Sequence, residues 1–316
     1  MLARLQRFTQ LVLLLLAAAW AGAALSRGHP WIAAIGAALI LGSFVMVLAF
    51  EFVLVALVHG DDPAPRPSPW ALLRAWLTEC ITSARVFGWW QPWRAARWPD
   101  LDHSAAATGL VFVHGYVCNR GFWTPWMERC HREGRPFVAV SLEPVFGSID
   151  AMTPSIDAAV RRLQHATGRA PIIVAHSMGG LAVRAWLADM AGAAQRVAHI
   201  VTIGTPHAGT WLARWGLTHN ARQMRPGSDW LRALAAKEER RGLTRERRRF
   251  TCFHGHADNI VFPPRRAVID GAAVHHLPAT PHVAMAYHPA VVAEVERLLH
   301  SADALTDKGA IASATG

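Results

Sequence analysis

The chain has 316 residues, which allows one sizeable α/β domain with additional segments and does not require a second domain. Its formal net charge is +10, but the arginines are dispersed and no nucleic-acid-binding motif accompanies them, which argues against a nucleic-acid partner. A basic protein beside an anionic membrane surface is the simpler interpretation. The cysteines have no C-x-x-C spacing and indicate neither a disulfide framework nor a zinc site; they are Cys80, Cys118, Cys130 and Cys252.

Two long apolar runs occupy the first 60 residues. Residues 8–25 carry no charge, and residues 31–50 are also uncharged and continue past Glu51 to residue 58. Each run is close to the length that a helix needs to cross a bilayer, and a helix of a soluble protein rarely stays apolar on every face. The sequence therefore predicts two transmembrane helices, a hairpin within residues 1–60. The alternative is a cleaved signal peptide, with Arg4 and Arg7 as its basic region and residues 21–23 as its cleavage site.

Positive charges indicate the orientation of this hairpin. Arg4, Arg7 and the amino terminus precede the first run, whereas the connector at residues 26–30 contains only Arg27. Because cytoplasmic flanks are enriched in lysine and arginine, the N-terminus is predicted to be cytoplasmic. Two crossings return the chain to the same side, so we expect a multi-pass protein of a bacterial inner membrane with residue 60 onward in the cytoplasm.

A proline-rich linker at residues 61–69 precedes an aromatic and basic segment at residues 70–98. Leu72, Leu73, Trp76, Leu77 and Ile81 have helical spacing. Tryptophan and arginine together favour the headgroup region, so a helix at the membrane interface is one interpretation. A helix packed on the next domain is the other, because amphipathicity does not separate the two. Residues 61–104 are therefore assigned to a linker and an amphipathic segment.

Strands and helices alternate through residues 105–300. Short apolar runs predict buried strands, and apolar positions three or four residues apart predict helices. The predicted strands are residues 109–114, 136–142, 171–174, 197–203, 250–254 and 274–277, and the predicted helices are residues 122–133, 155–167, 180–187 and 289–299. This alternation implies a mostly parallel sheet with helices on both faces. The tail at residues 301–316 is expected to be disordered.

Residues 171–187, PIIVAHSMGGLAVRAWL, pass from strand to helix with no room for an ordinary loop. Ser177 stands at the junction, and Ala175 and Gly179 are small where the backbones nearly touch. This segment resembles the nucleophile elbow of the α/β-hydrolases, G-x-S-x-G, with alanine in place of the first glycine. Certain bacterial lipases carry the same Ala-His-Ser-Met-Gly. The resemblance implies the α/β-hydrolase fold with Ser177 as nucleophile; the alternative is a tight turn with an incidental serine.

The same resemblance implies an oxyanion hole. In this family an early strand ends in a His-Gly turn, here His114 and Gly115, and the next backbone N–H forms half of the hole. By resemblance that N–H belongs to Tyr116. The other half is the N–H of Met178, which follows the nucleophile at a helix N-terminus, where orphan amides and the helix dipole favour negative charge.

The family order of serine, acid and histidine selects the rest of a catalytic triad. Asp258 lies just past the strand at residues 250–254 and is our choice of acid, ahead of Asp229 and Asp270. His282 lies between the last strand and the last helix and is our choice of base.

Four other histidines compete with His282 as the base. His207 directly follows the strand after the elbow, in a Thr-Pro-His-x-Gly segment similar to one in bacterial lipases, and the resemblance gives it a structural or pocket-shaping role. His275 and His276 lie within the last strand, and His288 lies at the final helix cap.

Two segments between the elbow and the acid have other expected roles. Residues 225–231 resemble a lipase segment that borders the substrate cleft, so a short cap is expected within residues 211–234. Residues 237–249 form a dense charge run, which is typical of a solvated turn and helix.

These features predict a membrane-anchored serine esterase, similar to carboxylesterases and triacylglycerol lipases, that cleaves apolar carboxylic esters through an acyl-enzyme on Ser177. No metal or organic cofactor is expected. The expected partners are an apolar ester or lipid substrate and membrane lipids. The alternatives are a serine acyltransferase or thioesterase of the same fold, and an inactive membrane-anchored interaction protein.

Overall fold

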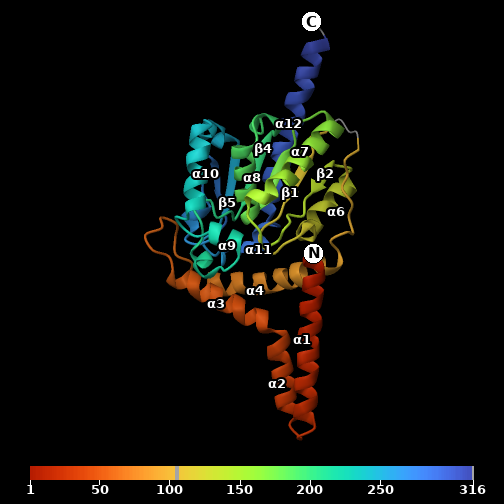
Figure 1. Cartoon of the computed structure of the whole chain (residues 1–316), viewed down its shortest axis with the longest axis vertical. Helices are drawn as coiled ribbons and strands as arrows, with labels where there is room; N and C mark the ends of the chain where they lie inside the picture. Colours follow the sequence, from red (N-terminus) through yellow and green to blue (C-terminus); the bar gives the residue numbers. More distant parts are fainter. Residues whose placement is uncertain (104–106, 315–316) are drawn as a thin grey trace.

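A six-stranded parallel sheet forms the centre of the larger part of the molecule (Figure 1). The computed structural model describes residues 1–103 and 107–314, with side chains described through Leu305. In sheet order the strands are β2 (Phe137–Ala139), β1 (Leu110–Val113), β3 (Ile172–His176), β4 (His199–Ile203), β5 (Phe250–His254) and β6 (Ala273–His276). Each strand overlaps its predicted segment, and the predicted parallel sheet is confirmed.

Helices cover both faces of this sheet. Alternate side chains of a strand point to opposite faces. Val111 and Val113 belong to an apolar core with α7 (Thr153–Thr167) and α8 (Met178–Asp189), whereas Leu110 and Phe112 belong to a second core with α6 (Thr124–Glu133) and α12 (Pro289–Ala314). Burial on both faces explains why the strands are continuous apolar runs.

The segment after β4 packs beside α8. It contains the α-helices α9 (His219–Gln223) and α10 (Asp229–Arg240) and the 3₁₀ helices η5 (Trp211–Trp215) and η6 (Leu243–Arg249). Leu234 of α10 is buried against Ala185 and Ala188 of α8. The predicted solvated turn and helix at residues 237–249 are present, although Glu238 is buried in an ion pair with Arg184. The remaining short elements are η2 (Arg120–Trp123), η3 (Asp150–Met152), η4 (Ala194–Arg196), η7 (Pro264–Ala267) and α11 (His282–Met285).

The last helix continues beyond its predicted end. α12 runs to Ala314, so the structure has helix where the sequence suggested a disordered tail after residue 301. The carboxylate of Asp303 accepts hydrogen bonds from the backbone N–H of Thr108 and from the guanidinium groups of Arg135 and Arg169. These contacts tie the start of the tail to the domain.

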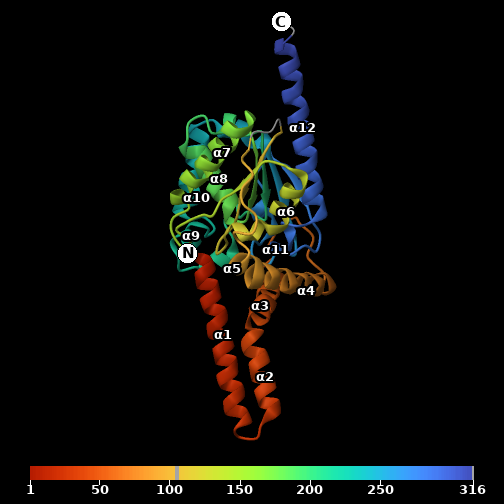
Figure 2. The same ribbon diagram turned by 90° about the vertical axis from the view of Figure 1, so that its right-hand side faces the viewer.

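Two N-terminal helices form a hairpin that projects from the domain (Figures 1 and 2). They are α1 (Leu2–Leu25) and α2 (Pro30–Leu41). The indole N–H of Trp20 donates to the carbonyl of Ile32 at 3.0 Å, and a Cβ added at Gly36 would lie 1.8 Å from that indole nitrogen. Glycine therefore permits the close approach of the two helices. Among the described residues, α1 is the one single helix long and apolar enough to cross a membrane.

The prediction of a second transmembrane helix in residues 31–58 is wrong in one respect: these residues do not form a single straight helix. The apolar run breaks at Gly42 into α2 and α3 (Ser43–Leu57), whose axes differ by 59°. The physical reason is packing of α3 on protein: Phe52 is buried with Ala75 and Ala257, and Leu54 and Val55 are buried with Phe262. The α2 and α3 pair is a second candidate span only if the bent pair is counted as one.

The aromatic segment forms α4 (Pro69–Arg85), the π-helical η1 (Val86–Trp90) and α5 (Gln91–Trp93). The hydroxyl of Ser68 caps α4 by accepting from the N–H of Ala71. α4 lies across the base of the domain, on the side from which the hairpin projects (Figures 1 and 2). One face of α4 is buried and the opposite face, with Leu77 and Ile81, is exposed, so the helix packs on the domain and still presents an apolar surface.

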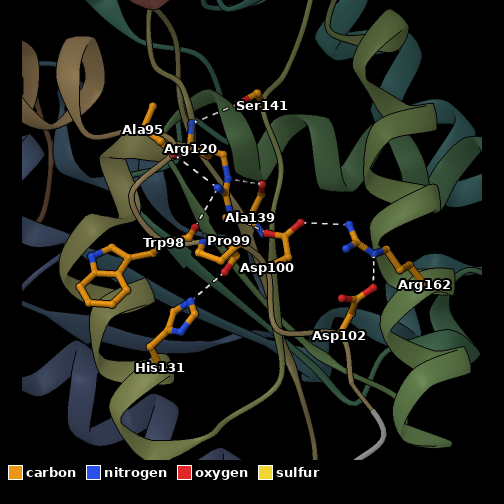
Figure 3. A network of polar contacts seen from close by, with 10 residues as sticks. All are labelled: Ala95, Trp98, Pro99, Asp100, Asp102, Arg120, His131, Ala139, Ser141 and Arg162. Carbon is orange, nitrogen blue, oxygen red and sulfur yellow. Dashed lines mark hydrogen bonds and ion pairs between the residues drawn. The ribbon is translucent and has the colours of Figure 1, made fainter.

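A polar network binds residues 95–102, which follow α5, to the domain (Figure 3). The guanidinium of Arg120 donates to the carbonyls of Ala95 and Trp98 and to the carboxylate of Asp100. Arg162 of α7 pairs with both Asp100 and Asp102. The network ties residues 95–102 to the sheet edge at β2, where Asp100 accepts from the backbone N–H of Ala139.

Candidate active site

Ser177 stands at the junction of β3 and α8 in a strained conformation. Its φ is +55° and its ψ is −131°, a region that residues with a Cβ rarely adopt. The backbone N–H of Ser177 donates to the carbonyl of Ile203 at 2.8 Å, which ties the turn to the end of β4. The predicted strand-to-helix elbow is therefore present.

The backbone around Ser177 is packed so closely that the neighbouring residues must be small. A Cβ added at Gly179 would lie 2.5 Å from the carbonyl oxygen of His114, and one added at Gly115 would lie 2.7 Å from Cβ of Ser177. Both distances are shorter than real Cβ contacts. Ala175, at the position of the first glycine of the motif, is fully buried. The elbow consequently lies against the end of β1.

Asp258 and His282 form a buried hydrogen-bonded pair. Nδ1 of His282 lies 3.0 Å from each carboxylate oxygen of Asp258, and both side chains are almost fully buried. Oδ1 of Asp258 also accepts from the backbone N–H groups of Ile260 and Val261, at 2.9 and 2.7 Å. Burial alone would lower the pKa of His282, but the charge and hydrogen bond of Asp258, with further acidic groups nearby, raise this pKa above its ordinary value.

The two expected oxyanion-hole residues, Tyr116 and Met178, lie after the end of β1 and at the start of α8. Tyr116 follows Gly115 at the end of β1 and lines the same cavity as Ser177. Its hydroxyl lies 3.0 Å from that of Thr218. Met178 is the first residue of α8, and the first N–H groups of a helix have no intrahelical acceptor. His114 stabilises the preceding turn: its Nε2 accepts from the N–H of Leu142, and burial lowers the pKa of His114 to about 4.

The competing acids and bases lie elsewhere. Asp229 pairs with Arg232 and is exposed, and Asp270 is exposed near Arg265. His207 is buried with its Nε2 3.1 Å from the hydroxyl of Thr202, and burial lowers its pKa well below the ordinary value. The remaining candidates His275, His276 and His288 lie in β6 or at the start of α12, and none of them lines the cavity that contains Ser177.

A cavity of about 220 Å³ contains both Ser177 and His282. Its apolar lining comes from Leu48 of α3, Phe87 of η1, Ile260 and Val283. None of the described residues lining it comes from residues 211–234, so the expected cap is misplaced, and α3, α4 and η1 cover the site instead.

Sequence reasoning missed several polar residues that line this cavity, among them Glu51, Glu79 and Asn259. Glu51 of α3 accepts from the side-chain amide of Asn259, and Glu79 of α4 is buried beside the loop of His282. A single acid interrupting the apolar run at Glu51 was the available signal. Among the described residues, no group of three or more His, Cys, Asp or Glu side chains could hold a metal ion.

Comparison with known proteins gives the same fold. A family model described as alpha/beta hydrolase fold matches residues 109–249. The mature form of the Bacillus licheniformis lipase BlEst2 has a TM-score of 0.53 and 18% identity, over 64% of this chain and 94% of that chain. Its propeptide form has a TM-score of 0.51 and 18% identity, over 60% of this chain and 49% of that chain. No curated protein matches in sequence.

Identity this low is informative about the fold alone. The family match covers β1 to η6, and the parallel sheet continues from it through β5 and β6. The part of the chain that carries Ser177, Asp258 and His282 therefore has the α/β-hydrolase fold.

Proposed function

We propose that this protein is a membrane-anchored serine esterase that cleaves apolar carboxylic esters through an acyl-enzyme on Ser177. The observation that carries the proposal is the shared cavity: a strained elbow serine and a histidine paired with a buried aspartate line the same small space. That combination of nucleophile, base and orienting acid is the arrangement that acyl transfer requires.

In the proposed mechanism Oγ of Ser177 attacks the ester carbonyl while Nε2 of His282 accepts the serine proton. Asp258 holds Nδ1 of His282, which leaves Nε2 as the atom that faces the reaction. The N–H groups of Tyr116 and Met178 would donate to the oxyanion. The protonated His282 then gives its proton to the leaving alcohol, and water repeats the sequence to release the acid.

Apolar ester substrates are favoured by the walls of the cavity. Leu48, Phe87, Ile260 and Val283 offer hydrocarbon surface next to the serine. The solved structures with TM-scores above 0.5 are of a lipase at 18% identity. They support the fold on which we propose this reaction, and the reaction class itself rests on the residues of the cavity.

Membrane attachment is supported by α1 and by the exposed face of α4. Trp70, Leu73, Leu77 and Ile81 are between 42% and 66% exposed, and they lie opposite the buried Glu79 on the helical wheel. Arg74 and Arg85 lie along one side of this apolar stripe and are exposed. An apolar stripe bordered by arginines is typical of a helix that lies in the headgroup region of an anionic bilayer.

The test of the reaction is Ser177→Ala in the full-length protein. We expect loss of hydrolysis of short and medium p-nitrophenyl esters and loss of fluorophosphonate labelling, with the melting temperature unchanged. Labelling of the variant at the wild-type rate would contradict the proposal. An acyl acceptor that diverts the product from acid to a new ester would indicate an acyltransferase.

We further propose that the domain lies on the cytoplasmic side of the inner membrane. The N-terminal ammonium group pairs with Glu143 of the domain at 3.0 Å, which supports a common side for the two. Alkaline phosphatase fused after Ser301 should be inactive and a cytoplasmic fluorescent reporter active. The reverse pattern would place the domain in the periplasm.

A further inference from the structure

A carboxylate of α4 holds the loop that carries His282. Glu79 is fully buried. Its Oε1 accepts from the backbone N–H of Val283 at 2.8 Å, and its Oε2 accepts from that of Ala284 at 3.2 Å. Both carboxylate oxygens are therefore used on the two residues that follow His282.

A second acid reaches the same loop through an amide. Asn259, which follows Asp258, is 1% exposed. Its Nδ2 donates to Glu51 of α3 at 2.7 Å, and its Oδ1 accepts from the backbone N–H of His282 at 3.2 Å. Three consecutive backbone N–H groups, at residues 282, 283 and 284, are thus each bound by a side chain.

We propose that Glu79 and the Glu51–Asn259 pair are positioning residues that fix the backbone of His282 so that its imidazole faces Ser177. The proposal rests on the proposed function. Both acids lie on helices that precede residues 109–249, so two anchoring elements outside the matched region supply part of the catalytic geometry.

The burial of Glu79 supports a functional reason for the acid. Burying a carboxylate without a cationic partner costs free energy. Replacing buried charged groups by apolar residues of similar volume is often neutral or stabilising for the fold. None of the ion pairs described for the chain includes Glu79; its contacts are backbone amides. Desolvation raises the pKa of Glu79 to about 7, against the lowering effect of these hydrogen bonds and of His282. Acids held at this cost cluster at functional sites.

Glu79→Gln in the full-length protein in detergent or vesicles tests the proposal. Glutamine keeps one oxygen acceptor and presents an NH₂ group to the other backbone N–H, which displaces the loop. Because misplacement by about 1 Å can cost about 100-fold, we expect kcat to fall by about 10- to 100-fold with KM within about twofold. The rate of fluorophosphonate labelling should fall by the same factor.

Glu238→Gln is the matched control. It makes the same isosteric change in a buried carboxylate that pairs with Arg184 and does not line the cavity. We expect it to lower the melting temperature and to leave kcat unchanged. This contrast separates a positioning role from a general loss of stability.

Wild-type kcat and labelling rate in folded Glu79→Gln would overturn the proposal. If that variant does not accumulate as folded protein, Asn259→Ala decides by the same two rates, since it removes no charge and breaks the hydrogen bond to His282. A wild-type protein that neither hydrolyses esters nor reacts with the fluorophosphonate would refute the proposed function itself, whereas equal reactivity of wild type and both variants refutes only the positioning role.

Discussion

Replacing Asp258 with Asn is expected to reverse the tautomer of His282. The backbone N–H groups of Ile260 and Val261 both donate to Oδ1 of Asp258, so the oxygen of an asparagine would stay at that position. Its NH₂ group would then point at Nδ1 of His282, where a carboxylate oxygen now lies at 3.0 Å. Oδ1 also lies 3.0 Å from Nδ1, but the two backbone N–H groups already use both of its lone pairs. Nδ1 would therefore accept a hydrogen bond from the NH₂ group, and the proton would move to Nε2.

A histidine protonated at Nε2 cannot accept the serine proton. In serine proteases of the Ser-His-Asp type, the corresponding Asp→Asn change lowers kcat by about 10⁴. That factor corresponds to about 5.5 kcal/mol of transition-state stabilisation. Because the asparagine keeps both backbone hydrogen bonds, we expect the free energy of unfolding to change by no more than about 1–2 kcal/mol.

The assay is kcat for a p-nitrophenyl ester, with urea unfolding as the measure of stability. Asp229→Asn is the control, because Asp229 is an exposed acid paired with Arg232 and remote from the cavity. Activity of Asp258→Asn within tenfold of wild type would refute the reasoning, as would a loss that appears in Asp229→Asn instead.

Three further outcomes are expected. His282→Ala should abolish ester hydrolysis and slow phosphonate labelling. His207→Ala should keep kcat and lower the free energy of unfolding by about 1–3 kcal/mol, since it empties a buried site. Labelling at the normal rate in His282→Ala and not in His207→Ala would exchange the roles of the two histidines. The pH profile of kcat/KM should rise with pH to a plateau with a midpoint above 6.5, because the base must be neutral and its pKa is raised; a midpoint below 6.5 would contradict this. Gly204→Ala should lower both stability and kcat, because φ is +54° and the new Cβ would lie 3.0 Å from Oδ2 of Asp258 and from Nδ1 of His282. Gly192→Ala, where φ is +72° and the surrounding space is open, should lower stability alone.

Local chemistry made much of the fold predictable. The predicted strand at residues 250–254 has the same bounds as β5. The elbow was predicted from Ala175 and Gly179, the two small residues around Ser177. Strand and helix alternation implied a parallel sheet because a parallel pair requires a crossover. The family order of serine, acid and histidine, together with the positions of Asp258 and His282 just past predicted strands, selected the two residues that the fold brings together.

The arrangement of the N-terminal helices was not predictable in the same way. Apolarity predicts burial and does not say whether lipid or protein covers a side chain, so residues 31–58 read equally well as a membrane span. The break at Gly42 and the packing of Phe52 on Ala75 are tertiary facts. The cap was placed at residues 211–234 by family resemblance, although α10 in that region packs on α8 instead.

Helices α3 and α4 connect the proposed membrane attachment to the proposed active site. The same two helices supply Leu48 to the cavity wall and Glu51 and Glu79 to the loop of His282. The outer face of α4, with Leu77 and Ile81, is exposed, and Glu79 on its inner face binds the loop that carries His282. Under the proposed attachment, a displacement of α4 at the membrane surface would reach the residues after His282 through two hydrogen bonds, because Glu79 binds the backbone N–H groups of Val283 and Ala284 directly. The cavity of the proposed active site is therefore lined in part by α3 and α4, the helices that connect the hydrolase fold to the hairpin.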